Sequence, residues 1–81
     1  MLCEVYRSGK RMDTYLYLPM GAEYQELPDQ LQQQFGPASK VLTINLSERS
    51  QLARITSQAL IEHLNDTGYY LQLPPKQELN A

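Results

Sequence analysis

The sequence predicts an α+β fold, an α/β/α sandwich built on a single four-stranded, largely antiparallel sheet with helices packing on its faces. Runs of β-forming residues and runs with helical spacing follow one another in the order β-β-α-β-α-β. Glycine and proline mark most boundaries between these runs. A length of 81 residues with 42% hydrophobic content is typical of one globular domain. We therefore predict one domain over residues 1–75 and a flexible tail over residues 76–81.

An antiparallel hairpin is predicted at the start of the chain. The segments Leu2–Ser8 and Thr14–Leu18 are rich in residues that favour β-strands. The polar stretch Ser8–Asp13 between them contains Gly9 and has the length of a hairpin loop. Pro19 ends the second strand, because proline has no N–H to donate to a β-ladder.

A short helix is predicted next, between two prolines. Pro28 suits the first helical position, where the missing N–H costs nothing. From Leu27 to Phe35 an apolar residue recurs at every fourth position, which gives the helix one apolar stripe. Gly36 is typical of a residue that ends a helix, and Pro37 prevents its continuation.

The second half of the chain is predicted to hold a third strand, a long helix and a fourth strand. Lys40–Leu46 shows the alternation of a half-buried strand. Ser47 is placed to cap a helix that runs to about Asn65, with Gly68 as its terminator. Tyr69–Leu73 has the composition of a strand.

Alternation along the strands predicts one aliphatic and one tyrosine-rich face, because successive side chains of a strand point to opposite sides. The aliphatic face, which we expect the long helix to cover, consists of Cys3, Val5, Leu16, Leu18, Leu42, Ile44, Leu46, Leu71 and Leu73. The tyrosine-rich face consists of Glu4, Tyr6, Tyr15, Tyr17, Thr43, Asn45, Tyr70 and Gln72. We expect the short helix to pack on this second face, part of the face to stay open, or both.

Composition and charge limit the class of protein. The net charge of −2 argues against affinity of the whole surface for nucleic acid or anionic membrane. A single cysteine excludes an intrachain disulfide and fits a reducing cytoplasm. No apolar run approaches the ~20 residues of a membrane span, and the charges near the N-terminus argue against a signal peptide. We expect a cytoplasmic protein with no cofactor, no metal and no membrane partner.

Cys3 and His63 are the two residues that suggest nucleophilic catalysis. Their predicted places, on the aliphatic face and on the buried side of the long helix, allow them to approach each other. A small thiol-dependent or hydrolytic enzyme is therefore an alternative hypothesis. The interpretation that we favour is a core cysteine and a histidine held by the dipole of a helix C-terminus. One histidine and one cysteine do not fill a tetrahedral metal shell, so no metal site is predicted.

A cluster of cations in the hairpin loop is the strongest candidate for a binding site. Arg7, Lys10 and Arg11 lie in or beside this loop and can hold an anion or a phosphate backbone. Tyrosines on the adjoining strands offer stacking surfaces of the kind that bind single-stranded nucleic acid. The predicted binding residues are therefore Tyr6, Arg7, Lys10, Arg11, Tyr15 and Tyr17. The alternative is a solvated loop above partly buried tyrosines.

Both ends of the chain resemble one small bacterial family. The segments that carry the resemblance are Met1-Leu2-Cys3, Tyr6-Arg7-Ser8, Lys10-Arg11, Thr14-Tyr15-Leu16-Tyr17, Phe35-Gly36 and Gly68-Tyr69-Tyr70-Leu71-Gln72-Leu73-Pro74-Pro75. In these segments the chain is similar to the YcgL family, while the middle of the chain agrees mainly in pattern. The resemblance implies a small α/β/α sandwich, a cytoplasmic location and a Gram-negative source, and it implies no activity. It also offers a link to RNA metabolism, because some members are encoded near a D-type ribonuclease.

Our leading hypothesis is a non-enzymatic binding or adaptor domain that works through an unknown protein partner, with RNA as a second class of partner. A further hypothesis, beside the thiol enzyme, is a structural subunit that buries its tyrosine-rich face in an oligomer. Sequence alone does not separate these two, because aromatic-rich faces also serve as interfaces between subunits.

Overall fold

The computed structural model of the chain describes residues 1–48, 51–52 and 54–74. Its sheet has four strands in the order β3-β1-β2-β4, and every neighbouring pair is antiparallel. The elements are β1 (Leu2–Ser8), β2 (Tyr15–Pro19), α1 (Asp29–Phe35), β3 (Ala38–Asn45), α2 (Ser57–Asp66) and β4 (Tyr70–Gln72), with short 3₁₀ turns at Tyr24–Glu26 and Leu46–Glu48. The predicted fold class and element order are therefore confirmed. The predicted flexible tail, residues 76–81, lies outside the described residues.

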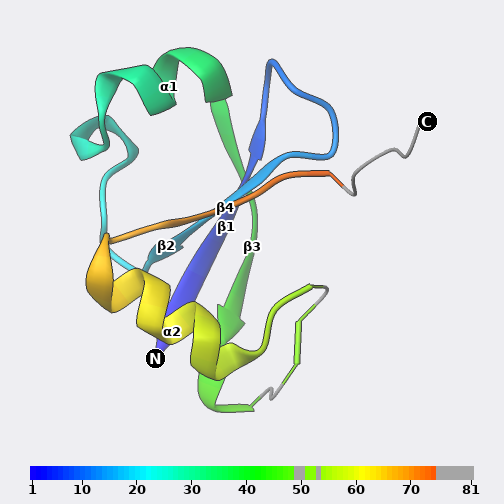
Figure 1. The fold of residues 1–81 in the computed structure, drawn as a ribbon, viewed down its shortest axis with the longest axis vertical. Coiled ribbons are helices and arrows are strands. Elements are labelled where there is room, and N and C mark those ends of the chain that lie inside the picture. The colour runs from blue at the N-terminus through cyan, green and yellow to red at the C-terminus, as the bar shows by residue number, and fades with distance from the viewer. Residues whose placement is uncertain (49–50, 53, 75–81) are drawn as a thin grey trace.

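Helix α2 covers the larger of two cores, on one side of the sheet (Figure 1). The buried members of this core are Cys3, Val5, Tyr17, Ile44, Leu46, Leu52, Leu60 and Leu64. Leu60 and Leu64 lie one turn apart on α2, so a single stripe of the helix faces the sheet. The hydroxyl of Tyr17 donates to Gln72 Oε1 at 3.1 Å, which satisfies the polar end of this buried ring.

Helix α1 covers a smaller core on the opposite side, toward the other end of the sheet (Figure 1). Leu16, Leu18 and Phe35 are its buried members. With only seven residues, α1 is a short cover. The helix ends at Gly36, as predicted. Gly36 has a φ of 74°, a conformation that favours glycine. In the described part of the chain no helix is long and apolar enough to cross a membrane.

The predicted division into an aliphatic and a tyrosine-rich face is wrong for β2. Val5 lies opposite Tyr17, and Tyr6 lies opposite Leu16. Residues directly opposite each other in an antiparallel pair point to the same side of the sheet. Tyr17 therefore shares the α2 side with Val5, and Leu16 shares the α1 side with Tyr6. A one-residue shift of the hairpin register would have given the predicted arrangement, since such a shift exchanges the two faces of a strand.

The side chains of β4 face the same sides as their partners on β2, because Leu16 pairs with Leu71 and Tyr17 pairs with Tyr70. Leu71 therefore faces α1, and Tyr70 faces α2. Only β3 has its aliphatic side chains on the same side of the sheet as those of β1, as predicted, because Ile44 lies opposite Cys3. The tyrosines are thus divided between the two sides of the sheet, and the predicted tyrosine-rich face does not form.

The predicted start of the long helix is also wrong. The amide and hydroxyl of Ser47 both donate to Asn45 Oδ1, at 3.1 and 2.6 Å, within a 3₁₀ turn. An isolated antiparallel bridge between Gln51 and Thr56 then turns the chain back. Helix α2 begins only at Ser57, where Thr56 Oγ1 accepts a hydrogen bond from the amide of Ala59 at 3.2 Å. Positions 49, 50 and 53 of the predicted helix lie outside the described residues.

Candidate binding surface

The cations of the hairpin loop do not form one free cluster. The ammonium group of Lys10 donates to the carbonyl oxygen of Gln33 at 2.9 Å, and Ser8 Oγ donates to the carbonyl oxygen of Phe35. Both carbonyls belong to the last turn of α1, where a helix leaves acceptors without partners. Lys10 therefore stabilises the C-terminus of α1, as a cation in this position does. Arg11 lies beside it, near Gln34.

The tyrosines of the predicted site are separated as well. Tyr17 is buried in the α2 core, Tyr15 packs against the same core, and Tyr6 lies on the opposite side of the sheet. Arg7 and Tyr15 remain neighbours, because they pair directly across β1 and β2. The six predicted residues are thus divided over both faces and the loop. Their role in binding stays a prediction, without the shared stacking face on which it was based.

The predicted meeting of Cys3 with His63 is not supported. Cys3 is fully buried, and burial raises the pKa of its thiol from 9.0 to about 11. The thiol therefore stays protonated at neutral pH, whereas a catalytic cysteine needs a lowered pKa. His63 is exposed, in contrast to its predicted place on the buried side, and its ring lies 4.9 Å from that of Tyr70.

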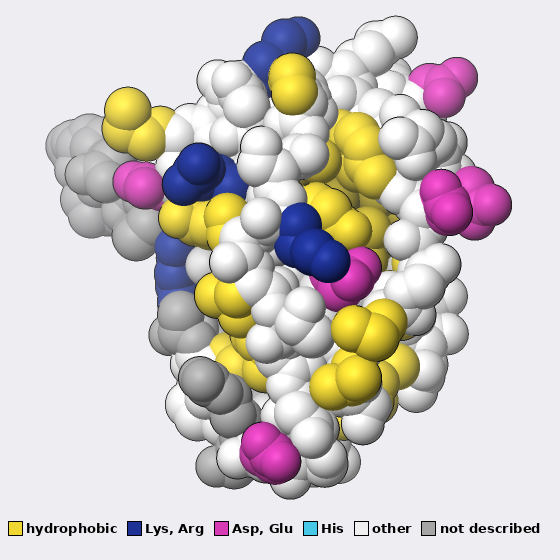
Figure 2. All heavy atoms as spheres, turned by 180° about the vertical axis from the view of Figure 1, so that it is seen from behind, with side chains coloured by type: hydrophobic (Ala, Val, Ile, Leu, Met, Phe, Trp, Pro, Cys, Tyr) yellow, Lys and Arg dark blue, Asp and Glu magenta, His cyan; other side chains and the backbone are white. Residues whose placement is uncertain are grey.

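A hollow of about 690 Å³ lies on the α1 side of the sheet, where β1 faces the segment that follows β2. Its lining consists of Glu4, Tyr6, Met20, Gly21, Ala22, Glu23, Tyr24, Gln25, Pro37 and Ala38. Figure 2 shows the back of the molecule, where hydrophobic side chains gather around a hollowed region and charged side chains lie among them. We call this feature the β1 hollow.

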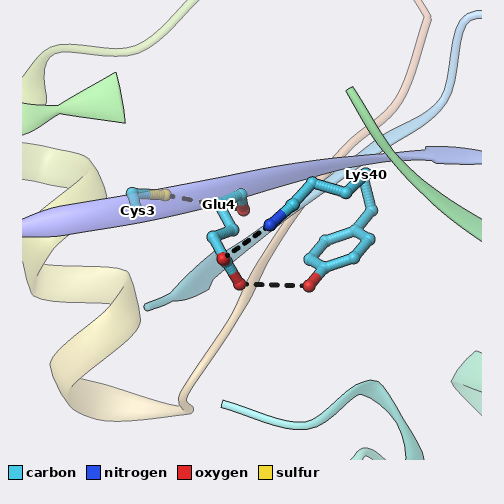
Figure 3. Close-up of polar contacts among 4 residues, drawn as sticks. Cys3, Glu4 and Lys40 are labelled. Carbon is cyan, nitrogen blue, oxygen red and sulfur yellow. Dashed lines mark hydrogen bonds and ion pairs between the residues drawn. The ribbon is translucent and has the colours of Figure 1, made fainter. Parts of the chain in front are cut away.

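Glu4 is the most constrained charge in the β1 hollow. Its Oε2 lies 3.2 Å from the ammonium of Lys40 on β3, and its Oε1 accepts a hydrogen bond from the hydroxyl of Tyr6 at 3.1 Å (Figure 3). The Glu4 side chain is only 13% exposed, whereas that of Lys40 is 52% exposed. The two partners fix the orientation of the carboxylate, which is a condition for selective recognition.

The negative charges of Glu4 and Glu23 both act on the hydroxyl of Tyr6 in the β1 hollow. Burial raises the pKa of Tyr6, and its hydrogen bond to Glu4 and the negative charges of Glu4 and Glu23 raise it further. The exposed Glu23 therefore lies close enough for its charge to affect the pKa of the Tyr6 hydroxyl. Tyr24 supplies the second aromatic ring of the β1 hollow. Its hydroxyl donates to the carbonyl oxygen of Gly36 at 2.7 Å, which fixes the orientation of the ring.

Sequence reasoning missed most of this hollow. Glu4 and Tyr6 were placed correctly on one face, but Lys40 joins them only because β3 pairs with β1 through a register shift. Tyr24 begins a short 3₁₀ turn and Glu23 precedes it, in a segment for which the sequence predicted no element. The one local signal was the alternation of Glu4 and Tyr6 on a strand whose other face is buried.

Together the fold and this surface define a small α+β domain with an open, aromatic and acidic hollow beside its sheet. Among the described residues, no group of three or more histidine, cysteine, aspartate or glutamate side chains is arranged to hold a metal ion. A model of the YcgL domain matches residues 3–75, and the chain belongs to this family. The resemblance seen in the sequence is therefore confirmed.

Relatives in bacteria are YcgL domain-containing proteins, and the match covers most of the length of each. The protein of Idiomarina loihiensis is 63% identical over 78 residues, which cover 96% of this chain and 91% of the relative. A protein of Vibrio vulnificus is 46% identical, with 96% of this chain and 83% of the relative covered. A protein of Mannheimia succiniciproducens is 38% identical, with 96% and 76% covered. These names identify the domain and state no activity.

Proposed function

We propose that the chain is a cytoplasmic, non-enzymatic binding or adaptor domain that takes up a segment of a protein partner in the β1 hollow. The observation that supports this proposal is the constrained carboxylate of Glu4, held by Lys40 and Tyr6 on a part of the sheet that α1 leaves accessible. A polar group that is oriented by neighbours and flanked by aromatic rings is typical of a recognition site.

The lining of the hollow favours a basic side chain with a long apolar stem. The rings of Tyr6 and Tyr24 offer contact area with little conformational entropy to lose. Glu23 adds an exposed negative charge at the rim, while the charge of Glu4 is partly balanced by Lys40. A lysine or arginine of a partner would therefore place its stem against the rings and its charge near Glu23.

The alternative of a thiol-dependent enzyme has less physical support. A buried cysteine whose pKa is raised to about 11 carries little thiolate at neutral pH. The single free cysteine is instead in keeping with the proposed cytoplasmic location, where thiols stay reduced.

A pull-down with matched charge reversals tests the proposal. Glu23→Lys and Glu62→Lys make the same change at exposed positions, one on the rim of the hollow and one on α2. We expect tagged wild-type protein and Glu62→Lys to capture the same partner from a bacterial lysate treated with nuclease, and Glu23→Lys to lose it. Capture that disappears with nuclease would point to RNA instead, and equal capture by both variants would contradict a role for the hollow.

A further inference from the structure

Strand β3 is a long and exposed edge of the sheet. It contributes eight residues, lies at the outer end of the strand order, and pairs only with β1 among the described strands (Figure 1). Val41 and Leu42 in its middle are 40% and 48% exposed. Edge strands with exposed apolar residues invite pairing with another chain, and proteins usually shorten or cover them.

A β-bulge gives this edge an unusual distribution of side chains. Leu42 lies opposite Val5 and Lys40 lies opposite Tyr6, so Val41 is the extra residue. Two residues of a bulged strand oppose one residue of the neighbour, so Val41 and Leu42 both lie next to Val5, on the α2 side. The exposed apolar side chains of β3 are thereby concentrated at its centre and on one face.

The bulge makes the strand complementary to itself. If two copies of β3 run antiparallel about a two-fold axis between Val41 and Leu42, the directly opposed pairs are Val41–Leu42, Lys40–Thr43, Ser39–Ile44 and Ala38–Asn45. Members of each pair must point to the same side of the joint sheet. The register to β1 meets this condition. On the α1 side, Lys40 lies opposite Tyr6 and Thr43 lies opposite Glu4. On the α2 side, Ser39 lies opposite Arg7 and Ile44 lies opposite Cys3.

The same register is complementary in charge. Lys40 of the second copy would lie opposite Thr43, which is itself beside Glu4 on β1. Two strand spacings separate that lysine from Glu4 by roughly 10 Å at the backbone, within the combined reach of the two side chains. Each Glu4 would then lie between its own Lys40 and that of the second copy, and no like charges would face each other across the axis.

We propose that two copies of the chain pair antiparallel through β3 and form one continuous sheet, with four strands from each copy. The contact is isologous, with Val41 and Leu42 of both copies at its centre. Because the two-fold axis is perpendicular to the sheet, the two β1 hollows open on the same side, and the dimer presents a partner with two equivalent sites.

Sedimentation equilibrium of the full chain, across a wide range of concentration, tests the pairing. Leu42→Lys introduces a charge at the apolar centre, and Met12→Lys makes a comparable change at a hairpin-loop residue that is 85% exposed. We expect wild-type protein and Met12→Lys to dimerise alike, and Leu42→Lys to associate about tenfold more weakly or not at all. Thermal unfolding followed by circular dichroism verifies that each variant is folded.

The charge arrangement and the register have their own tests. Lys40→Glu should weaken the dimer, and the double variant Glu4→Lys with Lys40→Glu should restore it. Lys40→Cys with Thr43→Cys should oxidise to a covalent dimer, while Ser39→Cys with Thr43→Cys should not. A wild-type protein that stays monomeric at every concentration, or a Leu42→Lys variant that dimerises as well as wild type, would overturn the proposal.

Discussion

At the scale of single residues, burial explains the pKa values of Cys3 and of three tyrosines, and no catalytic role is needed to explain them. The pKa values of Cys3, Tyr6, Tyr17 and Tyr24 are all raised, and burial is the first cause in each case. Raised values mean that the folded chain holds these protons more tightly than the unfolded chain. These groups are therefore neutral parts of the two cores and of the β1 hollow at physiological pH.

Because all four pKa values are raised, the stability of the fold should change at alkaline pH. The free energy of unfolding should be unaffected by these groups at neutral pH and should fall as the pH rises from 9.0, the ordinary pKa of a thiol, toward about 11, the value for Cys3. Urea unfolding at a series of alkaline pH values measures the effect. Cys3→Ala should reduce the slope without abolishing it, because the pKa values of Tyr6, Tyr17 and Tyr24 are raised as well.

Two outcomes would contradict this account of Cys3. Stability that is constant or increases through the alkaline range would mean that burial does not favour the thiol. Rapid modification of Cys3 by a thiol reagent at neutral pH, in the folded protein, would mean that the side chain is accessible and reactive.

At the scale of elements, nearly every strand and helix could be predicted, but the phase of β2 and β4 and the start of α2 could not. The segments of β1, β2, α1, β3 and β4 follow from propensity and alternation in the sequence. The face of β2 depends instead on the hairpin register, which pairs Arg7 with Tyr15 across a seven-residue connection. Nothing in the composition of β2 fixes that register, since both of its faces carry large side chains.

The start of α2 shows a second limit of local reasoning. Ser47 and Thr56 are both residues that cap helices, and the apolar residues between them have helical spacing. The chain instead forms a 3₁₀ turn at Ser47, whose amide and hydroxyl both donate to Asn45 Oδ1, and Leu52 reaches the α2 core from a non-helical segment. Asn45 thus gives Ser47 partners in a local turn, an arrangement that spacing and capping propensity do not predict.

The two capping candidates give a direct prediction. Thr56→Ala should reduce the free energy of unfolding by about 1 kcal/mol, because the amide of Ala59 loses its acceptor at the start of α2. Ser47→Ala should cost clearly less, because its hydroxyl serves an exposed turn. Urea unfolding of both variants, with hydrogen exchange of the α2 amides, separates the two positions. An equal or larger loss for Ser47→Ala, with no greater loss of protection at the α2 amides in Thr56→Ala, would contradict the role of Thr56 as the cap of α2.

At the scale of the whole molecule, the candidate surface arises from contacts that are distant in sequence. Glu4 and Tyr6 come from β1, Lys40 from β3, and Tyr24 from the connection to α1. The sequence indicated a binding domain with exposed tyrosines, but it grouped them with the loop cations. The fold uses Lys10 to cap α1 and buries Tyr17, whereas in the β1 hollow Lys40 and Tyr6 orient the carboxylate of Glu4.

Site-directed photo-crosslinking tests the central claim, that this hollow receives a protein partner. A photoreactive residue at Met20 would lie on the rim of the hollow, and one at Gln58 would lie on the exposed side of α2. We expect crosslinking from position 20 to yield one nuclease-resistant protein adduct that is lost when Glu23→Lys is added, and position 58 to yield none. The same adduct from both positions, or an adduct at position 20 that survives Glu23→Lys, would contradict the claim.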